Sequence, residues 1–212
     1  MSFDSYKNIG EVLKEYNISS TEENFIIETE FIIRESFQEE LMFSLREFNY
    51  NESEYAICEA IIFPVLKELY RNYRQKFTLW SHKALVYDEK LSGIPDYLLA
   101  KKSVLGKEVF ERPFFVAVEA KKDDFIKGWG QCLSEMVAIQ KINDSVKQQS
   151  VFGIVSNGQV WQFGKLRDSL FTKEINIYTI SDLHKLFAAL NFVFKQCEIQ
   201  SELLSEEGTS IK

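Results

Sequence analysis

The arrangement of apolar residues singles out one segment near the middle of the chain. Residues 114–122 read FFVAVEAKK, so five apolar residues follow one another before Glu119 and Lys121. A short unbroken apolar run is typical of a strand buried on both faces. Residues two apart in a strand point to the same side, so Glu119 and Lys121 are expected to share one face. A buried carboxylate and amine are costly unless they pair or bind an ion.

Further strands are predicted on both sides of this central strand. Residues 77–87 are β-prone and aromatic, and residues 93–102 form a short strand that opens with Gly-Ile-Pro-Asp. Together with the central strand they predict an antiparallel meander. Residues 151–163 predict a hairpin with a type I′ turn at Asn-Gly, and residues 171–180 alternate as a further strand does.

Helical spacing predicts helices at both ends of the chain. We expect a short helix within residues 1–20 and one or two helices over 21–48, where Thr21 offers an N-cap followed by acids. Ser181 is expected to cap a final helix, and the polar tail beyond Glu206 is expected to be disordered.

The helix predicted over 52–73 carries an acid in its apolar stripe. Asn51 and Ser53 are candidate caps, and Pro64 is expected to kink the helix or mark a tolerated bend. At about 100° per residue, Glu54 lies on the apolar face, from which it could reach a neighbouring sheet.

A helix over 123–142, capped by one of two aspartates, follows the central strand directly. Gly128 and Gly130 each cost about 1 kcal/mol in a helix interior. Either the helix begins after Gly130, or the two glycines let its backbone approach the sheet or a ligand closely. Gln131 lies at the end of this helix nearest the central strand.

Composition describes a globular chain of one domain. The chain has 212 residues, 45% of them hydrophobic, and a formal net charge of −7. The acidic total argues modestly against nucleic-acid binding but does not exclude a local basic face. Cys58, Cys132 and Cys197 are widely spaced and predict free thiols in a reducing cytoplasm. The polar start predicts no signal peptide, and no apolar run approaches the roughly 18 residues that span a membrane, so we expect no membrane partner.

Three predicted elements bring acids toward one point. Asp96 follows Pro95 at the head of one strand, Glu119 ends its neighbour, and Glu54 begins a helix. Carboxylates from adjacent strands can hold Mg²⁺ or Mn²⁺, which polarises phosphoryl oxygens and activates a bound water. Lys121 would neutralise phosphate charge or help to deprotonate that water, and Glu54 would add an outer ligand. The residues therefore predict a metal site that acts on a phosphodiester.

These residues resemble the signature of the PD-(D/E)XK nuclease superfamily. GIPDYLLA at 93–100 and VAVEAKK at 116–122 match its two motifs, with Asp96 as the aspartate and Glu119 and Lys121 as its E-x-K. Glu54 resembles the glutamate that this superfamily often carries on the preceding helix. Gln131 resembles the glutamine found in the nuclease domain of type I restriction subunits and in RecB-like nucleases. The tyrosine usual four residues later is absent, since Glu135 stands there.

The resemblance implies an α/β restriction-endonuclease-like fold. Its three-layer core would place a mixed central sheet between helices over residues 51–180, with a helical extension at 1–50 and a C-terminal helix and tail at 181–212. The chain is similar to a group of short bacterial proteins of the superfamily. The resemblance implies a Mg²⁺-dependent nuclease that acts on DNA rather than RNA. Dimerisation is common in this superfamily, so the resemblance also leaves a homodimer open.

Other interpretations of the same residues stay open. An Asp after a Pro is often a turn residue, and Glu119 and Lys121 could form an edge salt bridge. Glu54 is as plausible a helix-end acid as a ligand. A nuclease-fold protein without activity, serving as a nucleic-acid-binding or assembly module, is the alternative function.

Remaining side chains are interpreted more simply. Trp129 and Trp161 are interpreted as packing residues. The two histidines, His82 and His184, are interpreted as structural or surface residues. Three lysines are expected to be solvated and to lie beside the site, where they could contact phosphates: Lys101, Lys102 and Lys122.

Overall fold

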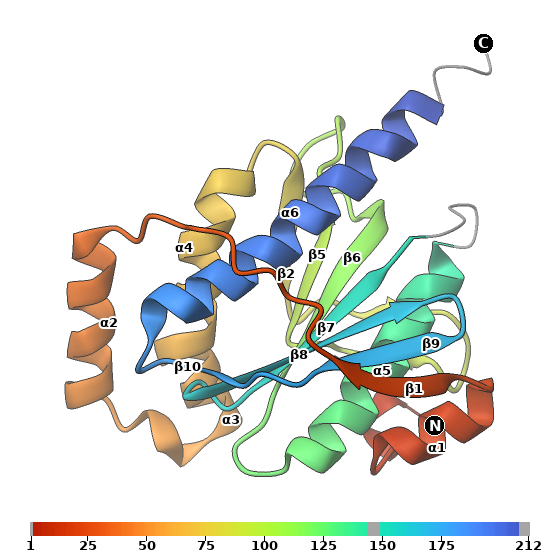
Figure 1. Cartoon of the computed structure of the whole chain (residues 1–212), viewed down its shortest axis with the longest axis horizontal. Helices are drawn as coiled ribbons and strands as arrows, with labels where there is room; N and C mark the ends of the chain where they lie inside the picture. Colours follow the sequence, from red (N-terminus) through yellow and green to blue (C-terminus); the bar gives the residue numbers. More distant parts are fainter. Residues whose placement is uncertain (1, 144–148, 208–212) are drawn as a thin grey trace.

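The computed structural model describes residues 2–143 and 149–207, and a twisted mixed sheet runs through it (Figure 1). The strand order is β1-β9-β8-β7-β6-β5-β2, with β10 paired to β8. The strands are β1 (Ser19–Glu23), β2 (Phe77–Ser81), β5 (Tyr97–Lys101), β6 (Glu111–Ala120), β7 (Val151–Ser156), β8 (Val160–Arg167), β9 (Leu170–Glu174) and β10 (Tyr178–Thr179). The pairs β6–β7 and β1–β9 are parallel and the others are antiparallel, which confirms the predicted mixed sheet.

Helices cover both faces of this sheet, and each face has its own hydrophobic core. One core is closed by α2 (Glu35–Glu47), α3 (Glu54–Ile57), the π-helical turn η3 (Cys58–Ile62), α4 (Phe63–Tyr73) and α6 (Leu183–Glu207). The other is closed by α1 (Ile9–Tyr16) and α5 (Phe125–Ile142). Short 3₁₀ turns, η1 (Phe3–Ser5) and η2 (Tyr50–Glu52), and a small ladder of β3 (Leu85–Val86) with β4 (Ser92–Gly93) complete the fold.

Side chains alternate between the two cores along β5 and β6. Leu99 packs into the first core, whereas Leu98 and Ala100 pack into the second, beneath α5. Ala117 also belongs to the second core, so Glu119, two residues later, is directed to the α5 side. The alternation therefore brings the polar end of β6 under the first turns of α5.

The N-terminal region differs from the prediction. The helix at residues 1–20 is present as α1, but the helix expected from Thr21 is wrong for residues 21–34. Residues Ser19–Glu23 form the polar edge strand β1, and α2 begins only at Glu35. The acids after Thr21 suggested a cap, but backbone pairing with β9 decides this segment, because an edge strand needs no apolar pattern.

The helix expected over 52–73 is interrupted by a π-helical turn and not by a simple kink at Pro64. Ser53 is its cap and accepts a hydrogen bond from the N–H of Ala56 at 3.1 Å. The π turn Cys58–Ile62 follows and continues into α4 without a break, because Ile62 and Phe63 both have right-handed helical backbone angles, and Pro64 is the second residue of α4.

Two predicted strands are divided in the structure. The strand expected over 77–87 breaks after β2, where His82 adopts a left-handed backbone with φ of 48°. The strand expected over 171–180 becomes β9 and β10. The predicted meander of β2, β5 and β6 is confirmed as antiparallel.

The hairpin of β7 and β8 is confirmed, but its turn type is not. Within this loop Gly158 alone has a positive φ, at 82°, whereas a type I′ turn needs two such residues. The loop is three residues long, and the Asn157 side chain accepts hydrogen bonds from the N–H groups of Gln159 and Val160 at 3.1 and 2.8 Å. The side chain satisfies these donors, so the mirror-image turn is not required.

The ends of the two long helices also test the predictions. Asp124 caps α5, because its carboxylate accepts a hydrogen bond from the N–H of Lys127 at 2.9 Å. At α6 the cap is Asp182 and not Ser181, since Asp182 accepts from the N–H of Lys185 at 3.2 Å. The tail expected to be disordered falls mainly in residues 208–212, outside the described residues.

The cysteines and the two tryptophans interpreted as packing residues are buried in the structure. Cys58, Cys132 and Cys197 are free and buried, and Trp129 and Trp161 are buried packing residues, as expected. Among the helices of residues 2–143 and 149–207, none combines the length and the apolar character that crossing a membrane requires.

Candidate active site

Asp96 lies just before β5 and is held against the end of β6. Its Oδ2 accepts a hydrogen bond from the backbone N–H of Ala120 at 2.7 Å, and its Oδ1 lies 3.3 Å from Nε2 of His82. Burial raises the pKa of Asp96, although the Ala120 hydrogen bond and the nearby Lys121 and His82 oppose that rise. Asp96 is therefore more than a turn residue, because it joins the start of β5 to the end of β6.

Glu119 and Lys121 share one face of β6, as predicted, and form a buried pair. Nζ of Lys121 donates to Oε1 of Glu119 at 2.7 Å, and the residues are 7% and 5% exposed. Burial, followed by the charge of Asp96, raises the pKa of Glu119 to about 7. Burial lowers the pKa of Lys121, but Glu119, Glu54 and Asp96 outweigh it and leave that pKa above its usual value. The amine is thus held in its charged form.

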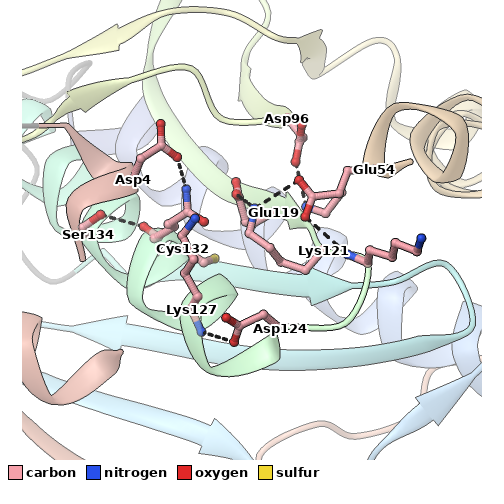
Figure 2. Close-up of polar contacts among 12 residues, drawn as sticks. Asp4, Glu54, Asp96, Glu119, Lys121, Asp124, Lys127, Cys132 and Ser134 are labelled. Atoms are coloured by element: carbon pink, nitrogen blue, oxygen red, sulfur yellow. Dashed lines mark hydrogen bonds and ion pairs between the residues drawn. The ribbon is translucent and has the colours of Figure 1, made fainter. Parts of the chain in front are cut away.

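Glu54 lies at the first position of α3 and reaches the same pair from the side, as Figure 2 shows. Its Oε2 is 3.5 Å from Nζ of Lys121, and its Oε1 accepts a hydrogen bond from the N–H of Lys122 at 3.3 Å. The side chain is 47% exposed, so Glu54 forms the solvent side of the cluster. The predicted convergence of Glu54, Asp96 and Glu119 is present in the structure.

Gln131 projects from the second turn of α5 into the same region. Its Nε2 donates to Oδ1 of Asp4 in η1, and its Oε1 is buried without a hydrogen-bond partner among the described residues. Gly130 explains this contact, because a Cβ there would lie 2.8 Å from the backbone N of Asn8. The glycine thus lets the N-terminal segment pack directly on α5, and Gln131 contacts Asp4 within this packing.

Glu135 is the carboxyl group that sequence reasoning left without a role. It lies one turn beyond Gln131, is 1% exposed, and lines the same cavity as Glu119, whose carboxyl raises the pKa of Glu135 through its charge and a side-chain hydrogen bond. Burial and the charges of Glu119 and Asp96 raise its pKa well above the usual value. A carboxyl within the apolar run LSEMVAI was the signal available in the sequence.

These side chains surround a cavity of about 520 Å³. Its polar lining is mostly acidic and is balanced chiefly by Lys121, with His82 beside Asp96. The apolar part of its wall is formed by Phe3, Tyr55 and Ile94. The carboxyl groups that line it belong to Asp4, Glu54, Asp96, Glu119 and Glu135.

Among the residues that line the cavity without having been assigned to the site from the sequence, three have side chains that can ionise: Asp4, His82 and Glu135. Asp4 comes from a segment more than a hundred residues away in sequence, and His82, interpreted as structural, contacts Asp96. By contrast, Lys101 and Lys102 lie at the opposite end of β5 from Asp96, so the expectation that they flank the site is wrong.

The donor set partly fits a divalent cation. Within residues 2–143 and 149–207, no three His, Cys, Asp or Glu side chains are already arranged to hold a metal ion. In this structure Oδ2 of Asp96 accepts a hydrogen bond from the Ala120 N–H, and Oε1 of Glu119 accepts one from Lys121. However, Mg²⁺ keeps several waters and is often bound through one or two carboxylates. The acidic oxygens around the cavity suit such a cation in kind.

Comparison with protein-family models and with curated protein sequences finds no match to this chain. The function must therefore be argued from the residues of the cavity themselves.

Proposed function

We propose that this chain is a Mg²⁺- or Mn²⁺-dependent nuclease that hydrolyses phosphodiester bonds, with DNA as the favoured substrate. The observation that carries the proposal is the arrangement of Asp96, Glu119 and Lys121. Two carboxyl groups and one amine meet at the joined ends of β5 and β6, inside a cavity, and all three are largely buried. Desolvating them is costly, and a charged ligand would offset that cost.

Asp96 and Glu119 are the residues that would hold the cation, with Glu54 at the solvent side. A bound Mg²⁺ supplies polarisation of phosphoryl oxygens and a more acidic water. The Ala120 N–H engages Oδ2 of Asp96 and Lys121 engages Oε1 of Glu119, while Oδ1 of Asp96 lies 3.3 Å from Nε2 of His82, so a cation at Asp96 would share that oxygen with His82 or displace it. The protein partners therefore fix the orientation of each carboxylate.

Lys121 is best suited to neutralise charge on the phosphate. Three carboxylates surround it and keep the amine protonated, so it can donate hydrogen bonds but does not readily accept a proton. Of the two roles expected from the sequence, this environment favours stabilisation of the developing negative charge on the scissile group.

The fold proposed for this activity is the restriction-endonuclease-like one. The antiparallel β5–β6 pair carries the acids, α5 follows β6, and β7 returns parallel to β6. This order agrees with the motif positions that resemble the PD-(D/E)XK superfamily. The proposal includes action in the cytoplasm, which the three free cysteines support.

A cleavage assay tests the proposal. Purified protein is incubated with single- and double-stranded DNA and RNA in Mg²⁺ or Mn²⁺, beside Asp96→Asn and Lys121→Ala. We expect cleavage that needs the cation and is lost in both variants. Folded wild-type protein that cuts none of these substrates would refute the nuclease function, as would full activity in Asp96→Asn.

A second candidate function rests on the engaged state of the acids. Since Glu119 already pairs with Lys121 and the cavity lining is acidic, the chain could be a nuclease-fold protein that binds or assembles without cleavage. Calorimetry that detects nucleic-acid binding but no cation binding would favour this candidate.

A further inference from the structure

Glu135 is unusual among the buried acids of this chain. Buried Glu68 has the Arg34 guanidinium as partner, and buried Glu174 accepts hydrogen bonds from backbone N–H groups, including those of Phe25 and Ile26. Among residues 2–143 and 149–207, Glu135 has neither kind of partner. Its contact is with the Glu119 carboxyl, and its Oε2 is buried without a hydrogen-bond partner in the described part of the chain.

Packing does not account for a carboxyl group at this position. The neighbouring α5 residues Cys132, Leu133, Met136 and Ile139 are fully buried in the second core. A leucine or methionine at 135 would extend that core without leaving a polar oxygen unpaired. A residue that weakens its own surroundings and touches a candidate metal ligand has a role beyond stability.

The contact is placed where it can fix the direction of Glu119. Lys121, just after β6, donates to Oε1 of Glu119, and Glu135 lines the same cavity from α5, where its side-chain hydrogen bond to Glu119 is one of the causes that shift the pKa of both acids. Two contacts from different elements define the plane of a carboxylate, whereas Lys121 alone leaves it free to turn further toward the amine. Groups that hold a metal ligand in this way matter nearly as much as the ligand.

We propose that Glu135 is a positioning residue, which holds the Glu119 carboxyl in the orientation that binds a divalent cation. This inference rests on the proposed function, since it assigns Glu119 as a ligand. Glu135 takes the place of the tyrosine that the superfamily resemblance leads one to expect, so the contact is a property of this chain.

The test compares Glu135→Leu, Glu135→Gln and the control Glu68→Leu with wild type. Mn²⁺ affinity is measured by calorimetry at one pH, DNA cleavage under single-turnover conditions, and the thermal unfolding midpoint without metal. For Glu135→Leu we expect an unchanged or higher midpoint, with Mn²⁺ affinity and cleavage lower by about 10- to 100-fold. Glu135→Gln keeps an N–H that can donate to Glu119, so it should recover most of the loss.

Each result decides the proposal. In Glu68→Leu the midpoint should fall while Mn²⁺ affinity is retained, because its ion pair lies outside the cavity lining. A lower midpoint with wild-type Mn²⁺ affinity in Glu135→Leu would make Glu135 a structural residue. Equal losses in the Gln and Leu variants would show that the contact with Glu119 is not what matters. Wild-type protein that binds Mn²⁺ but cuts no nucleic acid would refute the nuclease function alone, since affinity would still test Glu135; absence of Mn²⁺ binding would refute both.

Discussion

Glu68 and Glu135 are both buried carboxyl groups on helices, and their surroundings are opposite. Glu68 receives two guanidinium nitrogens of Arg34, with Nε at 2.8 Å and Nη2 at 2.5 Å from its oxygens. Glu135 contacts another carboxyl and leaves one oxygen without a hydrogen-bond partner among the described residues. The first arrangement holds two segments together, whereas the second weakens the fold locally, and such groups gather where chemistry is done.

The same contrast applies to the two ion pairs. Arg34–Glu68 lies outside the cavity lining and joins the segment before α2 to α4, while Lys121–Glu119 lines the cavity within one strand. The pKa of Glu68 is lowered by its partner, but that of Glu119 is raised despite its own. A pair whose carboxyl still resists ionisation is not optimised for stability, and this difference separates structural acids from candidate site acids.

The largest expected effect comes from removing the positively charged side chain of the Lys121–Glu119 pair. Lys121→Ala should lower DNA cleavage by about 10²- to 10³-fold, since the developing charge on the phosphate loses its partner. Stability should change little, because Glu119 can take up a proton. Single-turnover rates and urea unfolding measure the two effects. A variant that unfolds without a change in the rate per folded molecule would place Lys121 among the structural residues.

Removing the positively charged side chain of the Arg34–Glu68 pair should have the opposite outcome. Arg34→Ala leaves the Glu68 carboxylate buried without its partner, so the thermal unfolding midpoint should fall by about 5 to 10 °C. Cleavage per folded molecule should not change. Calorimetric unfolding and the cleavage assay together check this, and reduced activity at full folding would abolish the distinction between the pairs.

The pH dependence of stability should have opposite signs at the two sites. The pKa of Glu68 is lowered in the folded state, so its stabilisation is present above its ordinary value near 4.5 and lost as the pH falls. The pKa of Glu119 is raised to about 7, so its carboxyl favours the folded state at low pH and loses this as the pH rises from 4.5 to 7.

Replacing Glu119 isolates the contribution of its carboxyl group to the pH dependence of stability. In wild type, the Glu119 carboxyl should lower the unfolding free energy by roughly 1 to 3 kcal/mol between pH 5 and pH 8. Glu119→Gln should lack this decrease. Urea unfolding at several pH values without metal measures it. If the two proteins show parallel pH profiles, the carboxyl is not held in a destabilising environment.

The smallest expected effect concerns Gly130, where the N-terminal segment packs on α5 next to Gln131. A Cβ in Gly130→Ala would lie 2.8 Å from the Asn8 backbone N and 3.0 Å from the Tyr6 carbonyl oxygen. Despite the better helix propensity of alanine, the variant should lose about 1 to 2 kcal/mol of unfolding free energy, and Asp4 should move from Gln131. Urea unfolding checks this, and a more stable variant would show that the N-terminal segment adapts at little cost.

The sequence predicted the centre of the site better than its walls. Glu119 and Lys121 followed from strand period, and Asp96 from its position at the head of the neighbouring strand. Asp4 and His82 could not be placed, because their contacts depend on how the N-terminal segment packs and on a left-handed backbone at His82. The polar strand β1 was missed for a similar reason, since pairing with β9 and not an apolar pattern determines it.

The central claim is that the acids around Lys121 are placed for a divalent cation, and Mn²⁺ titration calorimetry tests it most directly. Wild-type protein should bind Mn²⁺ with a measurable heat, Asp96→Asn should lose that binding, and Arg34→Ala, measured below its unfolding midpoint, should retain it. Wild-type protein that binds no Mn²⁺ or Mg²⁺ while folded, or equal binding by wild type and Asp96→Asn, would contradict the claim.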